Sequence, residues 1–332
     1  MEIYPLFQWP GHRDAVYTLA AGANGQAVSA GGDGIVVAWN TSQPHNPGKA
    51  MFRLNSGIYI LLPPSAHHAG WLAGGRNGEL HSIFSDSYSH LPYSSTEIGD
   101  IHGSISAPGW PTPVSNGVAT GKTPIHDLQF MGNWLWSAHG DGRLLRWNLE
   151  DRFPSIDAAF ALAPSALRCL STHPSAPHLA SGSSDGKIRL TGEKGEILQE
   201  FVGHTLSVFS LLFLVGGKYL LSGSRDAHLA VWETESGKLL GRFPAHMGTL
   251  NHLVAIPECG WVGSAGRDKE IRLWDAHSLE LRRVINREHF PQHAHTHSVN
   301  RLLWMPGQRH LLSAGDDRKI RVWQFSQPDL AN

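Results

Sequence analysis

The chain has 332 residues, a formal net charge of -1, 36 Gly, 20 Pro, 12 Trp and two Cys. This near-neutral composition without long charged runs is typical of a compact globular protein, and it argues against a disordered or nucleic-acid-binding chain. No stretch reaches the roughly 18 consecutive apolar residues that span a bilayer, and Cys169 and Cys259 lie in different repeats, which argues against a disulfide framework.

One twelve-residue pattern returns seven times along the chain. Each copy begins with Ser (Ala in the second), has Asp or Asn four residues later, and in most copies has Trp six residues after that. The stretch between them alternates apolar and polar residues, as a half-buried strand does. The copies are SAGGDGIVVAWN from Ser29, AGGRNGELHSIF from Ala73, SAHGDGRLLRWN from Ser137, SGSSDGKIRLTG from Ser181, SGSRDAHLAVWE from Ser222, SAGRDKEIRLWD from Ser264 and SAGDDRKIRVWQ from Ser313.

The spacing of the copies predicts the architecture. The Asp or Asn positions are separated by 44, 64, 44, 41, 42 and 49 residues, and they are Asp33, Asn77, Asp141, Asp185, Asp226, Asp268 and Asp317. A period in the low forties with a Trp-Asp-like end predicts four-stranded propeller blades. One blade alone leaves its faces and edge uncovered, so the seven copies are expected to close into a ring.

The two chain ends predict how the ring closes. The last copy is followed by only a short tail, which leaves the seventh blade without its fourth strand. Residues Ile3 to Trp9 are therefore expected to supply that outer strand, a velcro-type closure. The N-terminal sequence MEIYPLFQWPGHRDA has no basic region followed by an apolar run, so we expect a cytoplasmic protein without a secretory signal.

The repeats resemble the WD40 repeat family over nearly the whole chain. The resemblance is plainest in GHTLSV…SGSRDAHLAVWE, Gly203 to Glu233, and AHMGTLN…SAGRDKEIRLWD, Ala245 to Asp275. It implies an all-β, seven-bladed β-propeller in a single domain over residues 1–332. The chain is also similar to stand-alone bacterial WD40 proteins of the Bacteroidetes type, through GHRDAVYTL near the start, LLSGSRDAHLAVW in blade five and the late HTHSVNRLLW…LLSAGDDRKIRVW. That similarity implies a cytoplasmic, monomeric ring.

The WD40 resemblance also implies a buried tetrad in several blades. Its members are a His before the first strand, the Ser of the second strand, the turn Asp and the Trp of the third strand. The matching sets are His12, Ser29, Asp33 and Trp39; His204, Ser222, Asp226 and Trp232; His246, Ser264, Asp268 and Trp274; and His295, Ser313, Asp317 and Trp323. A carboxylate satisfied in this way is structural rather than reactive, and a hydrolase triad would be needed only once.

Blades two to four depart from this pattern. Blade two has Ala73, Asn77 and Ile83; blade three keeps Ser137, Asp141 and Trp147 without a His at the expected place; blade four has Thr191 in place of Trp. Residues 85–117, rich in Ser, Gly and Pro, predict an inserted loop. Its origin is open, because either Ser89 to Tyr93 or Thr112 to Val118 could be the fourth strand of blade two.

Several motifs that suggest other chemistry are incomplete. Gly117 to Thr123 has three residues between its glycines, whereas a phosphate-binding loop needs four. His289, His293, His295 and His297 lack Cys or carboxylate partners for a metal site. The basic pairs Arg282-Arg283 and Arg318-Lys319 are offset by neighbouring acidic residues. The Trp-Asp pair of blade six is followed by Ala-His, so it does not form the Trp-Asp-x-Arg box by which some WD40 proteins act as ubiquitin-ligase adaptors. We therefore expect no cofactor, metal, nucleic acid or membrane partner.

The resemblance places the commonest binding surface on one face of the ring, around the mouth of the central channel. The residues expected there at the start of each first strand are Tyr17, Tyr59, His126, Arg168, Phe209, Asn251 and Asn300. Those expected just before the turn residue are Arg76, Arg225, Arg267 and Asp316. Aromatic and arginine side chains dominate binding energy at interfaces, so this rim suits a peptide or protein loop with apolar and acidic character.

Two functions from different classes fit the sequence. The first is a non-catalytic scaffold that binds a protein partner at this face. The alternative is a small-ligand sensor or enzyme that uses the central channel, with His126 and Arg168 beside Tyr59 as its candidate residues.

Overall fold

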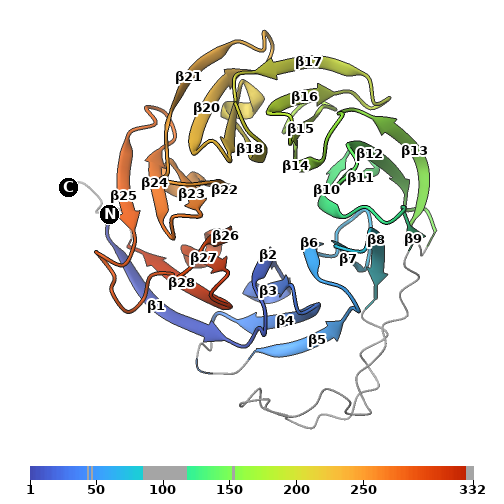
Figure 1. The fold of residues 1–332 in the computed structure, drawn as a ribbon. Helices are drawn as coiled ribbons and strands as arrows, with labels where there is room; N and C mark the ends of the chain where they lie inside the picture. The colour runs from blue at the N-terminus through green and yellow to red at the C-terminus, as the bar shows by residue number, and fades with distance from the viewer. Residues whose placement is uncertain (43–44, 46–47, 85–117, 152–153, 327–332) are drawn as a thin grey trace.

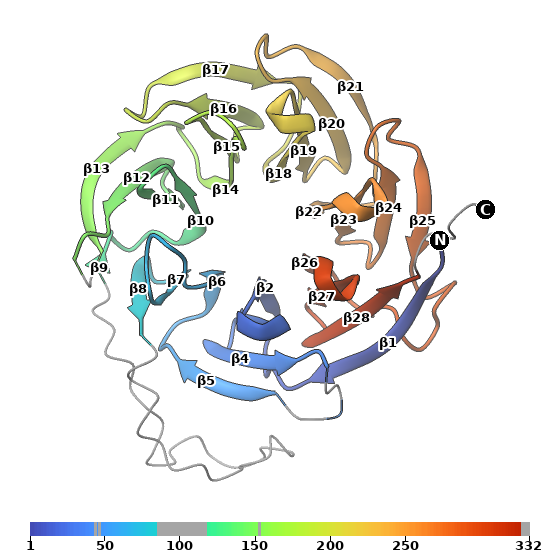
Figure 2. The ribbon, with the colours of Figure 1, turned by 180° about the vertical axis from the view of Figure 1, so that it is seen from behind.

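The computed structural model describes residues 1–42, 45, 48–84, 118–151 and 154–326. They form seven four-stranded antiparallel sheets around a common axis (Figure 1). The all-β, seven-bladed propeller expected from the repeats is confirmed. Four short 3-10 helices follow the first strands of blades one, five, six and seven (Figure 2): η1 (Ala23–Gly25), η3 (Val215–Gly217), η4 (Pro257–Cys259) and η5 (Pro306–Gln308).

Each blade has four strands from the axis outward. The innermost are β2 (Val16–Ala21), β6 (Ile58–Leu62), β10 (Ile125–Met131), β14 (Leu167–Thr172), β18 (Val208–Leu214), β22 (Leu250–Ile256) and β26 (Val299–Met305). The second are β3 (Gln26–Gly31), β7 (Trp71–Gly75), β11 (Trp134–His139), β15 (Leu179–Ser183), β19 (Tyr219–Ser224), β23 (Trp261–Gly266) and β27 (His310–Gly315). The third are β4 (Ile35–Asn40), β8 (Glu79–Ile83), β12 (Arg143–Asn148), β16 (Lys187–Thr191), β20 (His228–Glu233), β24 (Ile271–Asp275) and β28 (Lys319–Phe325). The outermost are β5 (Lys49–Arg53), β9 (Val118–Ala119), β13 (Ser155–Ala161), β17 (Ile197–Val202), β21 (Leu239–Pro244), β25 (Leu281–Ile285) and β1 (Ile3–Pro10).

The turn between the second and third strands follows from the repeated motif. In blade one the Asp33 carboxylate accepts the backbone N–H of Ile35 at 3.0 Å, which closes the turn. The residue after the turn Asp or Asn has a left-handed backbone in every blade. It is Gly in blades one to four, where this conformation costs little, and Ala227, Lys269 or Arg318 in blades five to seven.

Every innermost strand carries a β-bulge near its start. In β2 the pairing register shifts between Val16 and Thr18, which leaves Tyr17 as the extra residue. The same shift occurs at the equivalent place in all seven blades. A bulge redirects the side chain of its extra residue, so the seven bulged residues form one circle at the same end of the innermost strands.

The velcro-type closure is confirmed. β1 pairs antiparallel with β28, so the N-terminal strand completes blade seven. Trp9 of β1 is buried and stacks on Trp39 of blade one, with ring centroids 5.1 Å apart. The hydrophobic core is divided among the interfaces between blades, and the cluster at this seam also includes Val16 and Val322.

Blade two has a fourth strand of only two residues, β9, which pairs with Glu79 and Leu80 of β8. It overlaps the end of the second candidate, Thr112 to Val118. The first candidate, Ser89 to Tyr93, and the expected loop at residues 85–117 lie outside the described residues. Because β8 runs away from the turn at Asn77, the chain leaves the described part of blade two on the face opposite that turn.

Candidate functional site

Four blades contain the buried hydrogen-bonded set that the motif predicted. In blade five, His204 Nδ1 lies 2.9 Å from the Asp226 carboxylate and Nε2 lies 2.8 Å from Ser222 Oγ, while Trp232 Nε1 lies 2.8 Å from the same oxygen. The corresponding atoms of blades one, six and seven are joined in the same way, through His12, Ser29, Asp33 and Trp39; His246, Ser264, Asp268 and Trp274; and His295, Ser313, Asp317 and Trp323.

The donors and acceptors of the blade-five tetrad form one continuous order. An ionised carboxylate only accepts, so His204 Nδ1 donates to Asp226. Nε2 of the neutral ring then accepts the Ser222 hydroxyl hydrogen, and Ser222 Oγ accepts the indole N–H of Trp232. Burial lowers the pKa of His204, which keeps the ring neutral, while hydrogen bonds from Thr205 N–H and His204 outweigh burial and lower the pKa of Asp226. The set joins the loop before β18 to β19, β20 and the turn between these two strands. Ser222 is fully buried, so its hydroxyl is out of reach of a substrate.

In blade three a histidine from a different strand bonds to the serine. His139, at the end of β11, places Nε2 2.7 Å from Ser137 Oγ, and Trp147 Nε1 lies 2.8 Å from that oxygen. The turn residue Asp141 pairs instead with Arg143 at 2.6 Å. His139 was not predicted from the sequence, because the repeat pattern places the histidine in the loop before the first strand.

Blades two and four lack the set. In blade four, Asp185 pairs with Arg189 at 2.8 Å, and Thr191 Oγ1 donates to the carbonyl oxygen of Leu179. In blade two, His68 Nε2 lies 2.6 Å from Ser82 Oγ.

The bulged residues form a ring at the channel mouth, which we call the mouth ring. Its members are Tyr17, Tyr59, His126, Arg168, Phe209, Asn251 and Asn300, the first group predicted from the sequence. We call the face that bears this ring and the turns between second and third strands the top face. All seven residues are partly exposed.

Five members of the mouth ring contact one another in succession. Tyr17 and Tyr59 meet edge to face with centroids 5.4 Å apart, and Tyr59 stacks on His126 at 5.8 Å. Arg168 Nη1 lies 3.3 Å from His126 Nε2, and its guanidinium lies over the Phe209 ring at 5.7 Å. Blades one to five thus share a continuous surface of π faces and one cation, which can bind apolar and aromatic groups and a carboxylate.

The rest of the mouth ring is built from amides. Asn251 Nδ2 donates to the Val299 carbonyl oxygen at 2.8 Å, and Asn300 Nδ2 donates to the Val16 carbonyl oxygen at 3.1 Å. Each amide therefore ties its blade to the next one. Asn300 also donates to Asp316 at 2.7 Å.

Three arginines surround the mouth ring on the top face. Arg76, Arg225 and Arg267 are exposed, and in the part of the chain that the structure describes none forms an ion pair. Burial together with the Arg168 charge lowers the pKa of His126 to about 4, so this ring is neutral at physiological pH. The cationic character of the mouth comes from its arginines.

A second ring lies directly below the mouth ring, and sequence reasoning missed it. Its members, which we call the channel ring, are Thr18, Ile60, Asp127, Cys169, Ser210, His252 and Arg301, each one residue after a mouth-ring residue. The signal was present in the repeat alignment, which places a charged or titratable residue at this position in four blades. Burial raises the pKa of Asp127 to about 6, against the opposing effects of Arg301 and two backbone N–H groups.

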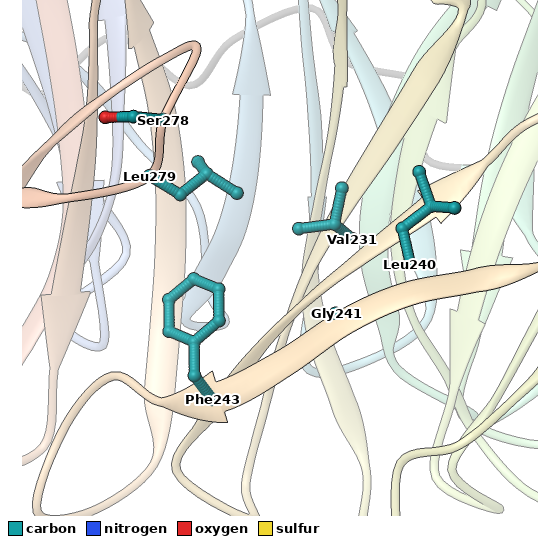
Figure 3. Close-up of a pocket in the computed structure, with 6 residues that line it drawn as sticks. All are labelled: Val231, Leu240, Gly241, Phe243, Ser278 and Leu279. Atoms are coloured by element: carbon teal, nitrogen blue, oxygen red, sulfur yellow. The ribbon is translucent and has the colours of Figure 1, made fainter.

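Two surface hollows lie away from the mouth ring. The first, of about 350 Å³, lies between blades five and six and is lined by Val231, Leu240, Gly241, Phe243, Ser278 and Leu279 (Figure 3). The second, of about 390 Å³, is lined by residues of blades two and three that include His67, Phe84 and Leu149.

Three histidines of blade seven in the run from His289 to His297 bond to separate partners. His295 belongs to its tetrad, whereas His289 Nδ1 bonds to Asn286 and His297 Nδ1 to Thr296. Among the described residues no group of three His, Cys, Asp or Glu is placed to hold a metal ion. None of the helices in the described ranges is long and apolar enough to cross a membrane.

Comparison with known proteins places these features among WD repeats. The family model "WD domain, G-beta repeat" matches residues 3–40, 162–191, 195–233, 237–275 and 287–324. Striatin of Rattus norvegicus is 25% identical over 296 residues, which cover 81% of this chain and 35% of striatin. GID complex subunit 7 of Schizosaccharomyces pombe is 35% identical over 86 residues, 25% of this chain and 17% of that protein. The chain thus spans about a third of the length of striatin.

A solved structure agrees with the fold over its whole length. The WD40 β-propeller domain of Doa1 superposes with a TM-score of 0.75 at 17% identity and covers 99% of this chain and 98% of that domain. At this identity the likeness concerns the fold alone.

Proposed function

The chain belongs to the WD40 repeat family, and we propose that it is a non-catalytic scaffold that binds a peptide or protein loop at its top-face mouth. The relatives support the general class, since one of them is named as a subunit of a complex. Because the propeller fold hosts many functions, the specific role of this chain has to be argued from a particular site on it.

The observation that carries the proposal is the unbroken arc from Tyr17 to Phe209. Its five side chains come from five blades and contact one another, so they offer a wide surface that is already ordered before a partner arrives. Preorganised aromatic and arginine side chains lose little entropy on binding.

The charges around the arc suggest the character of the partner. Arg76, Arg225 and Arg267 are exposed cations outside the ring of π faces. A partner segment with an aromatic or aliphatic side chain over the arc and carboxylates towards these arginines fits both features. The proposal includes a cytoplasmic location and a monomeric ring.

Affinity capture with two matched variants tests the proposal. The mouth variant carries Tyr59→Ala, Phe209→Ala and Arg225→Ala, and the control carries Tyr4→Ala, Leu198→Ala and Arg283→Ala on outermost strands, where all three residues are exposed. We expect a partner that the wild-type chain and the control retain and the mouth variant loses, with all three proteins melting alike. Equal capture by both variants would place the binding surface elsewhere.

A further inference from the structure

The channel ring has a regular structural task in several blades. Three of its side chains accept a backbone N–H of the next blade, from the residue after that blade's own channel-ring residue. Asp127 accepts from Leu170 at 2.7 Å, Ser210 from Leu253 at 2.9 Å, and His252 from Leu302 at 3.3 Å. These bonds close the inner edge of one blade against its neighbour.

Arg301 of blade seven cannot do this. A guanidinium carries five N–H donors and no acceptor, so it has nothing to offer the equivalent N–H of Leu19 in blade one. Within the described ranges no hydrogen bond or ion pair holds the Arg301 side chain. Thr18, the neighbouring member of the ring in blade one, is buried and its Oγ1 has no hydrogen-bond partner.

Arg301 lies on the innermost strand of blade seven, directly after its bulged residue. Its charge acts on His252 in blade six and also on Asp127 and Cys169, which belong to blades three and four across the ring from β26 (Figure 1). Arg301 and His252 are partly exposed although protein surrounds them on every side, so the channel has solvent-accessible space at this level.

The facing groups do not neutralise this charge by contact. Both oxygens of Asp127 already accept backbone N–H groups, from Leu128 at 2.9 Å and Leu170 at 2.7 Å, and no ion pair joins Asp127 to Arg301. His252 accepts the Leu302 N–H through Nδ1, so its ring is neutral. Within the described residues the Arg301 donors thus have only the solvent space of the channel beside them, and a carboxylate, sulfate or phosphate group can accept two of these donors side by side.

We propose that the central channel binds one small oxyanion, such as sulfate, phosphate or a small carboxylate, on the Arg301 guanidinium. The Thr18 hydroxyl of blade one, the blade next to that of Arg301, is a second group of the channel ring without a hydrogen-bond partner. This site is separate from the mouth arc and does not depend on the protein partner.

Calorimetric titration of the full chain with sodium sulfate at pH 7.5, at constant ionic strength set with chloride, tests the site. We expect one saturable site, weakened about tenfold to hundredfold by Arg301→Gln, since a charged hydrogen-bond donor is lost. Arg283→Gln, which removes an exposed arginine of the outermost strand β25, is the matched control and leaves the affinity unchanged. The absence of a saturable site, or equal effects of the two substitutions, overturns the proposal.

A second variant gives an effect of opposite sign and covers the case in which Arg301→Gln fails to fold. Asp127→Asn removes the negative charge that faces the anion while an oxygen remains to accept a backbone N–H. Sulfate then binds severalfold more tightly, because repulsion across the channel is lost. Unchanged or weaker binding in this variant contradicts an anion at Arg301.

Discussion

Replacing Ser222 by Ala should destabilise the protein far more than the same change at Ser181. The two serines occupy the same position in blades five and four, and both are fully buried. Ser222 Oγ serves two partners, His204 Nε2 at 2.8 Å and Trp232 Nε1 at 2.8 Å. Ser181 Oγ has one weak bond, to the Arg189 carbonyl oxygen at 3.3 Å.

The magnitudes follow from the groups left without partners. Ser222→Ala strands one buried donor and one buried acceptor at about 1–3 kcal/mol each, so the expected loss is about 2–6 kcal/mol. Ser181→Ala strands no side chain, and the expected loss is about 1 kcal/mol or less. The difference isolates the tetrad from the general cost of a buried Ser→Ala change.

Urea denaturation followed by tryptophan fluorescence and circular dichroism measures both changes. Coincident transitions of the two probes justify a single free energy of unfolding. The tetrad account predicts a clearly lower midpoint for Ser222→Ala alone. Similar midpoints for the two variants would show that the tetrad adds nothing beyond ordinary packing.

Two other predictions concern the pH dependence and the closure of the ring. Burial lowers the pKa of His126 and of His139 to about 4, so the unfolded state gains protons first as pH falls below about 6.5, and stability is lost between pH 6.5 and 4. Asp127, with its raised pKa of about 6, opposes part of this loss. Replacing His126 by Gln should reduce the fall in unfolding free energy between pH 7 and 4.5 by about 2.5 kcal/mol in urea titrations; an unchanged slope would contradict the buried neutral ring. Deleting residues 1–10 removes β1 and the buried Trp9, so calorimetry should show a loss of more than about 4 kcal/mol, whereas an unchanged melting temperature would contradict the closure.

The repeated motif made the fold predictable. Each Ser, turn Asp and Trp marks a second strand, its turn and a third strand, so seven copies specify seven blades. The closing strand followed from counting, because the last copy left blade seven one strand short. The fourth strand of blade two could not be placed, since β9 has two residues and carries no periodic pattern.

The site was less accessible to sequence reasoning. The mouth-ring residues could be located by alignment, but the contacts between Tyr59, His126 and Arg168 depend on how bulges of neighbouring blades face each other. His139 was missed because an equivalent hydrogen bond came from a different strand. Arg301 was missed because its surroundings include Asp127 and Cys169, which belong to blades three and four and lie far from it in the sequence.

We propose that the arc on the top face contacts a protein partner. Site-specific photocrosslinking tests it directly, with a photoreactive phenylalanine derivative placed either at Tyr59 in the arc or at Tyr219, the end of β19 away from the top face. The account predicts a covalent adduct with one protein from Tyr59, identified by mass spectrometry, and no adduct with that protein from Tyr219. An adduct from Tyr219 alone, or equal adducts from both positions, would contradict it.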